Sequence, residues 1–214
     1  MIDEAWLKPS NKEQQRREEK KEKLIIATLE ELEVSGLAGI RARDLAKKVG
    51  CAVGTIYNLV GDLDDLILLA CARTLQEYEV FVITRFEEAN KQGATNIELL
   101  ETMSASYVDF ATAHKCRWQA AFEVSYTESS HFYKIYTESQ RQLLNLIVNV
   151  LAQIDPSADH RELAAIGRAL WASVHGIAML AIANPANQMT RDKILIQCNR
   201  VIHPVVESLK QRRR

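Results

Sequence analysis

Glycine and proline are scarce in this chain of 214 residues, which has eight of the first and four of the second. These two residue types interrupt regular structure most strongly, so their scarcity allows long unbroken segments. Leu, Ala, Glu, Lys, Gln and Arg dominate the stretches between them, and these side chains lose little freedom in a helix. Because no alternating strand pattern competes, the sequence predicts an all-α protein.

Cysteines are few as well, and their spacing indicates no shared role. Cys51, Cys71, Cys116 and Cys198 lie far apart without a C-x-x-C pair, which argues against a zinc site or a dense disulfide framework. Residues 1–23 are rich in charge where a secretory signal needs an apolar core, and no run of about eighteen apolar residues follows. We therefore expect a cytoplasmic protein with reduced thiols, no metal site, no cofactor and no membrane contact.

An excess of positive charge is also missing, since 27 Lys and Arg face 28 Asp and Glu for a net charge of −1. Any contact with DNA must therefore come from a local patch. Between residues 36 and 60, four cations stand against Asp44, which leaves +3; they are Arg41, Arg43, Lys47 and Lys48. A basic cluster of this size is more often an ordinary solvated helix face, so charge alone does not decide the function.

Apolar residues at helical spacing predict a first helix that starts near Leu24 and stops at Ser35-Gly36, where glycine accepts a left-handed conformation. Residues 1–20 lack such a pattern and are expected to form a flexible arm. Further helices are predicted over residues 63–88, 97–114, 118–124, 131–154, 159–183 and 191–210. Breaks are predicted at Lys91-Gln-Gly93, Asp155-Pro156 and Asn184-Pro185.

Residues 42–60 have the pattern of a helix-turn-helix. Two helices that cross tightly need a small residue at the crossing, and the turn between them favours glycine because positive φ occurs there. Ala46 and Gly50 meet these two needs. Apolar residues on either side can close a three-helix core with the first helix, and the other positions of the second helix are then left to meet DNA.

This segment resembles the TetR family of transcriptional regulators. The matching residues are Gly36-Leu37, Arg43-Asp44-Leu45-Ala46, Gly50 and Gly54-Thr55-Ile56-Tyr57, followed by Asp62 and Leu66. The resemblance implies that residues 52–58 enter the major groove, that Tyr57 and Thr55 contact phosphates, and that Arg43 reaches a base or the backbone. The predicted DNA-binding residues are Arg41, Arg43, Lys47, Ala52, Val53, Gly54, Thr55, Tyr57 and Asn58.

Two residues depart from the pattern of the family. Arg41 stands where a Ser or Thr commonly caps the second helix, so we expect that helix to start uncapped. Leu63 stands where a lysine is frequent, which removes an expected phosphate contact. Both departures favour modest DNA affinity.

The C-terminal part is similar to a TetR subfamily named after a Trp-x-x-x-His-Gly motif, here Trp171 to Gly176. The resemblance implies a domain that senses a small-molecule inducer. Trp171 and His175 share a helix face, yet a lone His and Trp on an apolar helix more often only pack. The candidate ligand-binding residues are Met103, Tyr107, Phe110, Trp118, Phe122, Trp171 and His175.

The last two predicted helices each carry two apolar stripes and must be covered on two sides. The resemblance implies that they form the four-helix interface of a homodimer. The candidate interface residues are Leu170, Val174, Ile177, Ile194, Val201 and Val205. A twofold dimer would place its two reading helices about one DNA turn apart, or a multiple of it.

The expected organisation is an arm over residues 1–20, a helix-turn-helix DNA-binding domain over 21–68, and a helical regulatory and dimerisation domain over 69–214. The predicted function is that of a ligand-responsive repressor that binds a palindromic, double-stranded operator. An enzyme is one rival, because five histidines and many carboxylates are present, but no nucleophile elbow, phosphate loop or H-E-x-x-H pattern accompanies them. A protein-interaction module with weak or no DNA binding is the other.

Overall fold

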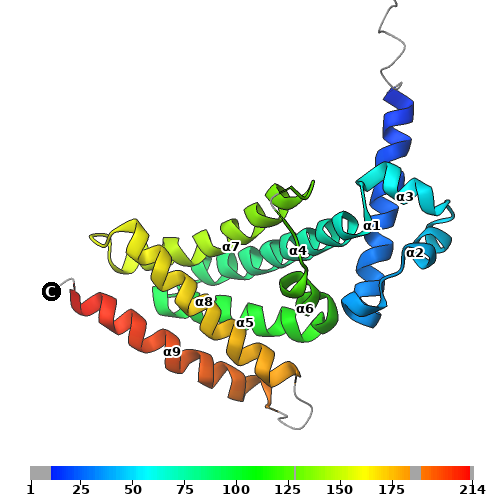
Figure 1. The fold of residues 1–214 in the computed structure, drawn as a ribbon. Helices are drawn as coiled ribbons and strands as arrows, with labels where there is room; N and C mark the ends of the chain where they lie inside the picture. Colours follow the sequence, from blue (N-terminus) through cyan, green and yellow to red (C-terminus); the bar gives the residue numbers. More distant parts are fainter. Residues whose placement is uncertain (1–10, 128, 184–188, 213–214) are drawn as a thin grey trace, which may run out of the picture. The chain divides into compact units, whose positions relative to one another are not determined.

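The helical content expected from the sequence is present in a computed structural model, which describes residues 11–127, 129–183 and 189–212. No strand occurs among these residues, so the all-α prediction is confirmed. The helices, shown in Figure 1, are α1 (Asn11–Gly39), α2 (Ala42–Val49), α3 (Val53–Val60), α4 (Leu63–Lys91), α5 (Asn96–Ala113), α6 (Lys115–Glu123), α7 (Tyr133–Ile154), α8 (His160–Ala183) and α9 (Arg191–Arg212).

Helix α1 begins earlier than its apolar pattern, because the charged residues from Asn11 onward are helical too. Its regular part ends at Gly36, whose φ of 61° and ψ of −166° lie outside the helical region. The stop predicted at Ser35-Gly36 is therefore confirmed. Of the flexible arm expected over residues 1–20, residues 11–20 belong to α1, and the rest lies outside the described residues, as does the break expected at Asn184-Pro185.

The chain divides into two compact units. The first combines residues 1–74 with 116–136, and the second combines residues 75–115 with 137–214. Helices α4 and α7 each contribute residues to both units. The domain boundaries expected from the sequence stay a prediction.

The core of the first unit forms where α1, α2 and α3 pack on one another. The apolar side chains at its centre are fully buried; they include Leu24, Leu32, Leu45, Ile56 and Leu66. Trp118 of α6, also fully buried, belongs to the same unit. This core holds the short helices α2 and α3, which are too short to be stable on their own.

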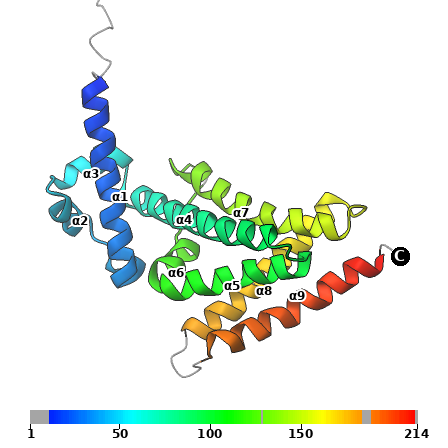
Figure 2. The same ribbon diagram turned by 180° about the vertical axis from the view of Figure 1, so that it is seen from behind.

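In the second unit, α5 packs against α8 and α9, and α8 packs against α9. Figures 1 and 2 show these three helices side by side from opposite directions. Helix α5 starts with a capping box in which the side chain of Thr95 accepts from the N–H of Glu98, and the Glu98 carboxylate accepts from the N–H of Thr95. This box satisfies two N–H groups that a helix start leaves unpaired.

Helix α8 is both long and apolar. By length and composition its residues His160–Ile182 could cross a membrane, a property that core helices of soluble proteins share. Only 28% of its apolar stretch is buried. Leu163, Leu170 and Val174 face the interior of the second unit, whereas Ala172 and Leu180 are exposed.

Candidate nucleic-acid interface and ligand pocket

The turn between α2 and α3 has the geometry that its sequence predicts. Gly50 ends α2 with a φ of 72°, in the left-handed region that glycine adopts without a Cβ clash. The N–H of Cys51 donates to the carbonyl of Ala46 at 2.9 Å and closes the turn. Ala46 is 2% exposed, so a larger side chain would have no room there. The roles predicted for Ala46 and Gly50 agree with this geometry.

The predicted DNA-binding residues lie on the outer side of this motif. Seven of them are exposed; they are Arg41, Arg43, Lys47, Ala52, Gly54, Tyr57 and Asn58. Val53 and Thr55 are half-buried. Tyr57 is 46% exposed although α3 has an apolar inner face at Ile56 and Val60. An exposed aromatic hydroxyl beside exposed cations is suited to contact phosphates.

Arg41 occupies the N-cap of α2 and makes no capping hydrogen bond with its side chain, which confirms the expected uncapped start. Its guanidinium instead donates to the carbonyls of Ala38 and Ile40, both at 2.8 Å. Lys48, on the same helix, forms an ion pair with Glu30 at 2.8 Å. The cations left for DNA on α2 are therefore chiefly Arg43 and Lys47.

The structure adds Arg17 to this region, a residue that the sequence analysis left in the expected arm. Its guanidinium donates to the carbonyl of Asn58 at 2.6 Å. A cation at the C-terminal end of a helix satisfies an unpaired carbonyl and opposes the negative end of the helix dipole. Arg17 therefore stabilises the last turn of α3. No local pattern separates it from the neighbouring charged residues.

The junction between α3 and α4 is tightly built. Gly61 has a φ of 96°, and a Cβ there would lie 2.9 Å from a carboxylate oxygen of Asp65. Asp62 accepts from the N–H of Asp65 at 2.6 Å, as predicted for an N-cap residue. The buried Asp65 carboxylate accepts from the backbone N–H of His131 at 3.1 Å and pairs with its Nδ1 at 2.8 Å. Leu63 is half-buried at this junction.

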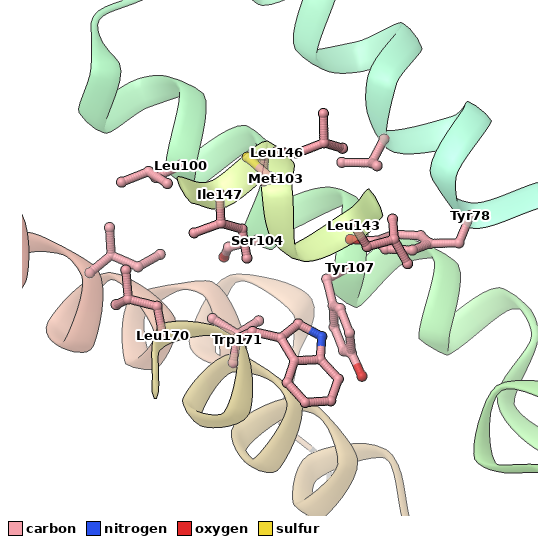
Figure 3. A pocket seen from close by; sticks show the side chains of 13 residues that line it. Tyr78, Leu100, Met103, Ser104, Tyr107, Leu143, Leu146, Ile147, Leu170 and Trp171 are labelled. Atoms are coloured by element: carbon pink, nitrogen blue, oxygen red, sulfur yellow. The ribbon is translucent and has the colours of Figure 1, made fainter. Parts of the chain in front are cut away.

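A pocket in the second unit has about 520 Å³ of space between its walls, part of it open to solvent. Helices α4, α5, α7, α8 and α9 all contribute to it (Figure 3). The lining residues are Tyr78, Val82, Leu100, Met103, Ser104, Tyr107, Leu143, Leu146, Ile147, Leu170, Trp171, Val174 and Ile202. Apolar and aromatic side chains make up almost all of this lining, as is usual for small-molecule sites.

Three of the predicted ligand-binding residues, Met103, Tyr107 and Trp171, line this pocket. Phe110 is buried outside the lining and contacts the ring of Tyr78 at 5.3 Å between centroids. Trp118 and Phe122 pack edge to face in the first unit, with centroids 5.0 Å apart.

His175 lies behind the pocket wall. Its Nδ1 is 2.5 Å from the hydroxyl of Tyr107, and its ring is 5.4 Å from that of Trp171. Burial lowers the pKa of His175, so the neutral ring is favoured and Nδ1 can accept from the hydroxyl. The pair satisfies the buried Tyr107 hydroxyl. His175 therefore positions a wall residue, which is the packing role that the sequence analysis kept open.

The candidate interface residues fall into two groups. Leu170, Val174 and Ile194 are buried within the single chain, and the first two line the pocket. Ile177, Val201 and Val205 are half-buried. The two valines also line a surface groove between α8 and α9. Among the described residues, no three His, Cys, Asp or Glu side chains gather as a metal site.

Comparison with known proteins agrees with the two-part reading of the sequence. Residues 100–194 match the family model of the tetracyclin repressor-like C-terminal domain. No curated protein matches the chain. The fold, in contrast, is found in many solved structures.

Three of these structures illustrate the similarity. A transcriptional regulator from Rhodococcus sp. Rha1 is 22% identical, with a TM-score of 0.64 over 88% of this chain and 96% of its own. A TetR-like transcriptional regulator from Rhodococcus sp. RHA1 is 14% identical, with a TM-score of 0.59 over 88% and 96%. FadR from Bacillus subtilis, solved in complex with stearoyl-CoA, is 17% identical, with a TM-score of 0.63 over 86% and 97%.

These findings define the class of the protein as one with the fold of TetR-type transcriptional regulators. More particularly, the chain carries a tetracyclin repressor-like C-terminal domain. The resemblance stated from the sequence is thereby confirmed for the fold and for the C-terminal domain. The Trp-x-x-x-His-Gly subfamily stays a prediction.

Proposed function

We propose that this protein is a cytoplasmic transcriptional repressor that binds a palindromic operator as a homodimer and releases it when a small molecule fills the pocket of the second unit. The observation that carries the proposal is the solvent-facing side of α3, where Gly54 and Tyr57 are exposed; α3 packs against α2, whose Arg43 and Lys47 are exposed as well. The opposite side of α3 is buried in the three-helix core. The exposed side is therefore free to enter a groove of DNA.

The chemistry of this face fits duplex DNA better than an acidic protein. Small residues at the start of α3, Ala52 and Gly54, allow its N-terminus to come close to a phosphate or a base edge. Arg43 and Lys47 supply charge for the backbone, and Asn58 can hydrogen-bond a base. The net charge of −1 leaves little nonspecific attraction elsewhere on the chain.

Exposed apolar side chains on the last two helices support the homodimer. Leu180 on α8 is 73% exposed and Ile196 on α9 is 54% exposed. A helix as apolar as α8 that buries only 28% of its apolar stretch needs a second surface to cover it. A second copy of α8 and α9 would supply that surface by twofold symmetry.

The ligand part of the proposal rests on the pocket and on one relative. The pocket is enclosed by five helices of one unit and is lined mainly by apolar side chains. The similar fold of FadR from Bacillus subtilis was solved with stearoyl-CoA. A small molecule in the corresponding domain of this chain is therefore a reasonable inducer, and catalysis has no comparable support.

The test is a gel-shift selection on fragments of the source genome over a range of salt concentrations. A repressor should retain a few fragments selectively, with affinity that falls steeply as salt rises. The retained fragments should share two inverted half-sites. Equal, weak retention of all fragments would contradict the proposal and favour the protein-interaction module.

We expect Gly54→Ala to weaken operator binding without destabilising the protein. A Cβ at Gly54 would meet no protein atom within 4 Å, and alanine is the better helix former by up to about 1 kcal/mol. The melting temperature should therefore stay or rise. In the major groove the added methyl group would meet DNA, so affinity should fall roughly ten-fold. Fluorescence anisotropy and thermal unfolding measure the two effects, and an unchanged affinity would mean that α3 does not approach DNA at this turn.

A further inference from the structure

Ser104 differs from the two hydroxyl residues that flank it on α5. The hydroxyl of Thr102 donates to the carbonyl of Glu98 at 2.8 Å, and that of Ser106 donates to the carbonyl of Thr102 at 2.7 Å. Both bonds run to the residue four positions earlier, as is usual for hydroxyls within helices. The Ser104 side chain is 4% exposed, yet its Oγ makes no hydrogen bond within the described part of the chain.

The Ser104 hydroxyl lies in the pocket wall (Figure 3). Outside the lining, the Ser104 hydroxyl interacts with the buried Cys198 of α9. Burial raises the pKa of Cys198, and the Ser104 hydroxyl lowers it by a smaller amount, so Cys198 is a neutral thiol. A thiol is a weak hydrogen-bonding group. The Ser104 hydroxyl can therefore still donate a hydrogen bond to a stronger acceptor inside the pocket.

The rest of the lining restricts what that partner can be. Apart from Ser104 it consists of aliphatic, Met, Tyr and Trp side chains, without any Asp, Glu, Lys, Arg or His. The Tyr107 hydroxyl is already bonded to His175. An ionised group in this pocket would lose its hydration without gaining a countercharge, which is far more unfavourable than the burial of a neutral oxygen.

We propose that the pocket binds an uncharged molecule with a hydrocarbon body and one carbonyl or hydroxyl oxygen, and that this oxygen takes the hydrogen bond from Ser104. The inference rests on the proposed function only where it links the ligand to the release of DNA; binding of the ligand itself can be measured without DNA. The lining, which is apolar except for Ser104 and the polar atoms of its aromatic side chains, suits a small hydrocarbon body such as one ring with a short chain. The phosphates of an acyl-CoA find no cation in this lining, so the ligand class differs from that seen with FadR.

The test uses three probes with the same number of non-hydrogen atoms, titrated by calorimetry into the full chain. Benzylacetone has a ketone oxygen, isopentylbenzene replaces the carbonyl by a branched hydrocarbon, and hydrocinnamate replaces the terminal methyl by a charged oxygen. Each probe is titrated into the wild type, Ser104→Ala and Ser106→Ala. Ser106 is the matched control because it is a buried serine on the same helix whose hydroxyl is bonded to the backbone.

We expect Ser104→Ala to weaken benzylacetone roughly ten-fold, the value of one hydrogen bond to a buried oxygen. The affinity for isopentylbenzene should stay the same or rise, and Ser106→Ala should change the relative affinity of the two probes by less than roughly two-fold. Hydrocinnamate should bind at least roughly a hundred-fold more weakly than benzylacetone. Without any probe, Ser104→Ala should be as thermally stable as the wild type or more so, because it removes an unpaired buried hydroxyl.

Three results would overturn this proposal. They are an unchanged preference for benzylacetone in Ser104→Ala, binding of hydrocinnamate as tight as that of benzylacetone, and no binding of any probe up to its solubility limit. The gel-shift selection separates this outcome from failure of the proposed function. If DNA fragments are retained selectively but Ser104→Ala leaves the affinity for benzylacetone unchanged, only the proposed ligand class is wrong. If Ser104→Ala weakens benzylacetone but no fragment is retained selectively, only the proposed repressor function is wrong.

Discussion

Replacing Tyr57 and Arg43 by alanine together should reduce operator affinity by roughly a hundred-fold or more, while helical content and dimerisation stay unchanged. Both side chains are exposed, on α3 and α2 respectively, so neither is needed for the core. A hydrogen bond to a charged group contributes about 1.5–3 kcal/mol, and each dimer would lose two copies of each contact. Because the binding energies of neighbouring contacts are not additive, the expected loss is well below the sum of the four contacts, at about 2.7 kcal/mol or more.

The salt dependence distinguishes the two residues. Arg43→Ala should lower the slope of log affinity against log salt by about 1.8 per dimer if each copy neutralises one phosphate. Tyr57→Ala carries no charge change and should leave the slope nearly unchanged. Lys48→Ala is the matched control, because its ammonium group is already paired with Glu30 at 2.8 Å. Unchanged affinity in both test variants would remove the DNA-binding interpretation of this segment.

Ala172→Glu should separate the proposed homodimer into monomers and thereby abolish tight operator binding. Ala172 is exposed on α8, on the side of the helix opposite to the buried Leu163 and Leu170. A carboxylate there would be desolvated in a helix-to-helix interface, and twofold symmetry would bring a second copy close to it. We expect the dimer dissociation constant to rise by roughly a hundred-fold or more, measured by sedimentation velocity.

Ala172 is chosen instead of Leu170, one of the candidate interface residues on the same helix, because a charge at Leu170 would act on the subunit as well as on the dimer. That side chain is 4% exposed and lines the pocket, so a charge there would disrupt the subunit itself. Ala113→Glu is the control, since Ala113 is an exposed alanine at the end of α5, a helix outside the proposed interface of α8 and α9. If Ala172→Glu and Ala113→Glu give the same dimer constant as the wild type, the interface lies elsewhere on the chain.

Much of the fold follows from local sequence patterns. The predicted helix over residues 97–114 corresponds to α5 at Asn96–Ala113, and the last predicted helix, over residues 191–210, corresponds to α9 at Arg191–Arg212. The left-handed turns at Gly36 and Gly50 and the cap at Asp62 were also predictable. Such features depend on a few consecutive residues, because helix periodicity, glycine geometry and capping are local.

Contacts between residues far apart in sequence were not predictable in the same way. Arg17 bonds to the carbonyl of Asn58 across 41 positions, and Asp65 pairs with His131 across 66. A charged residue in an amphipathic or polar stretch has many possible partners, and only the packing of helices selects one. The assignment of residues 1–20 to a flexible arm therefore missed the role of Arg17, and no local pattern paired Asp65 with His131.

The sequence by itself determined that the chain is helical, where most of its helices begin and end, and which face of α3 is left outside the three-helix core. These properties follow from apolar spacing, turn glycines and exposed small or basic residues along one segment. Only the tertiary structure decided that His175 supports Tyr107 and that the Ser104 hydroxyl makes no hydrogen bond to the preceding turn. The reason is physical: a serine in a helix can bond to the preceding turn or face outward, and the side chains packed around it decide between the two.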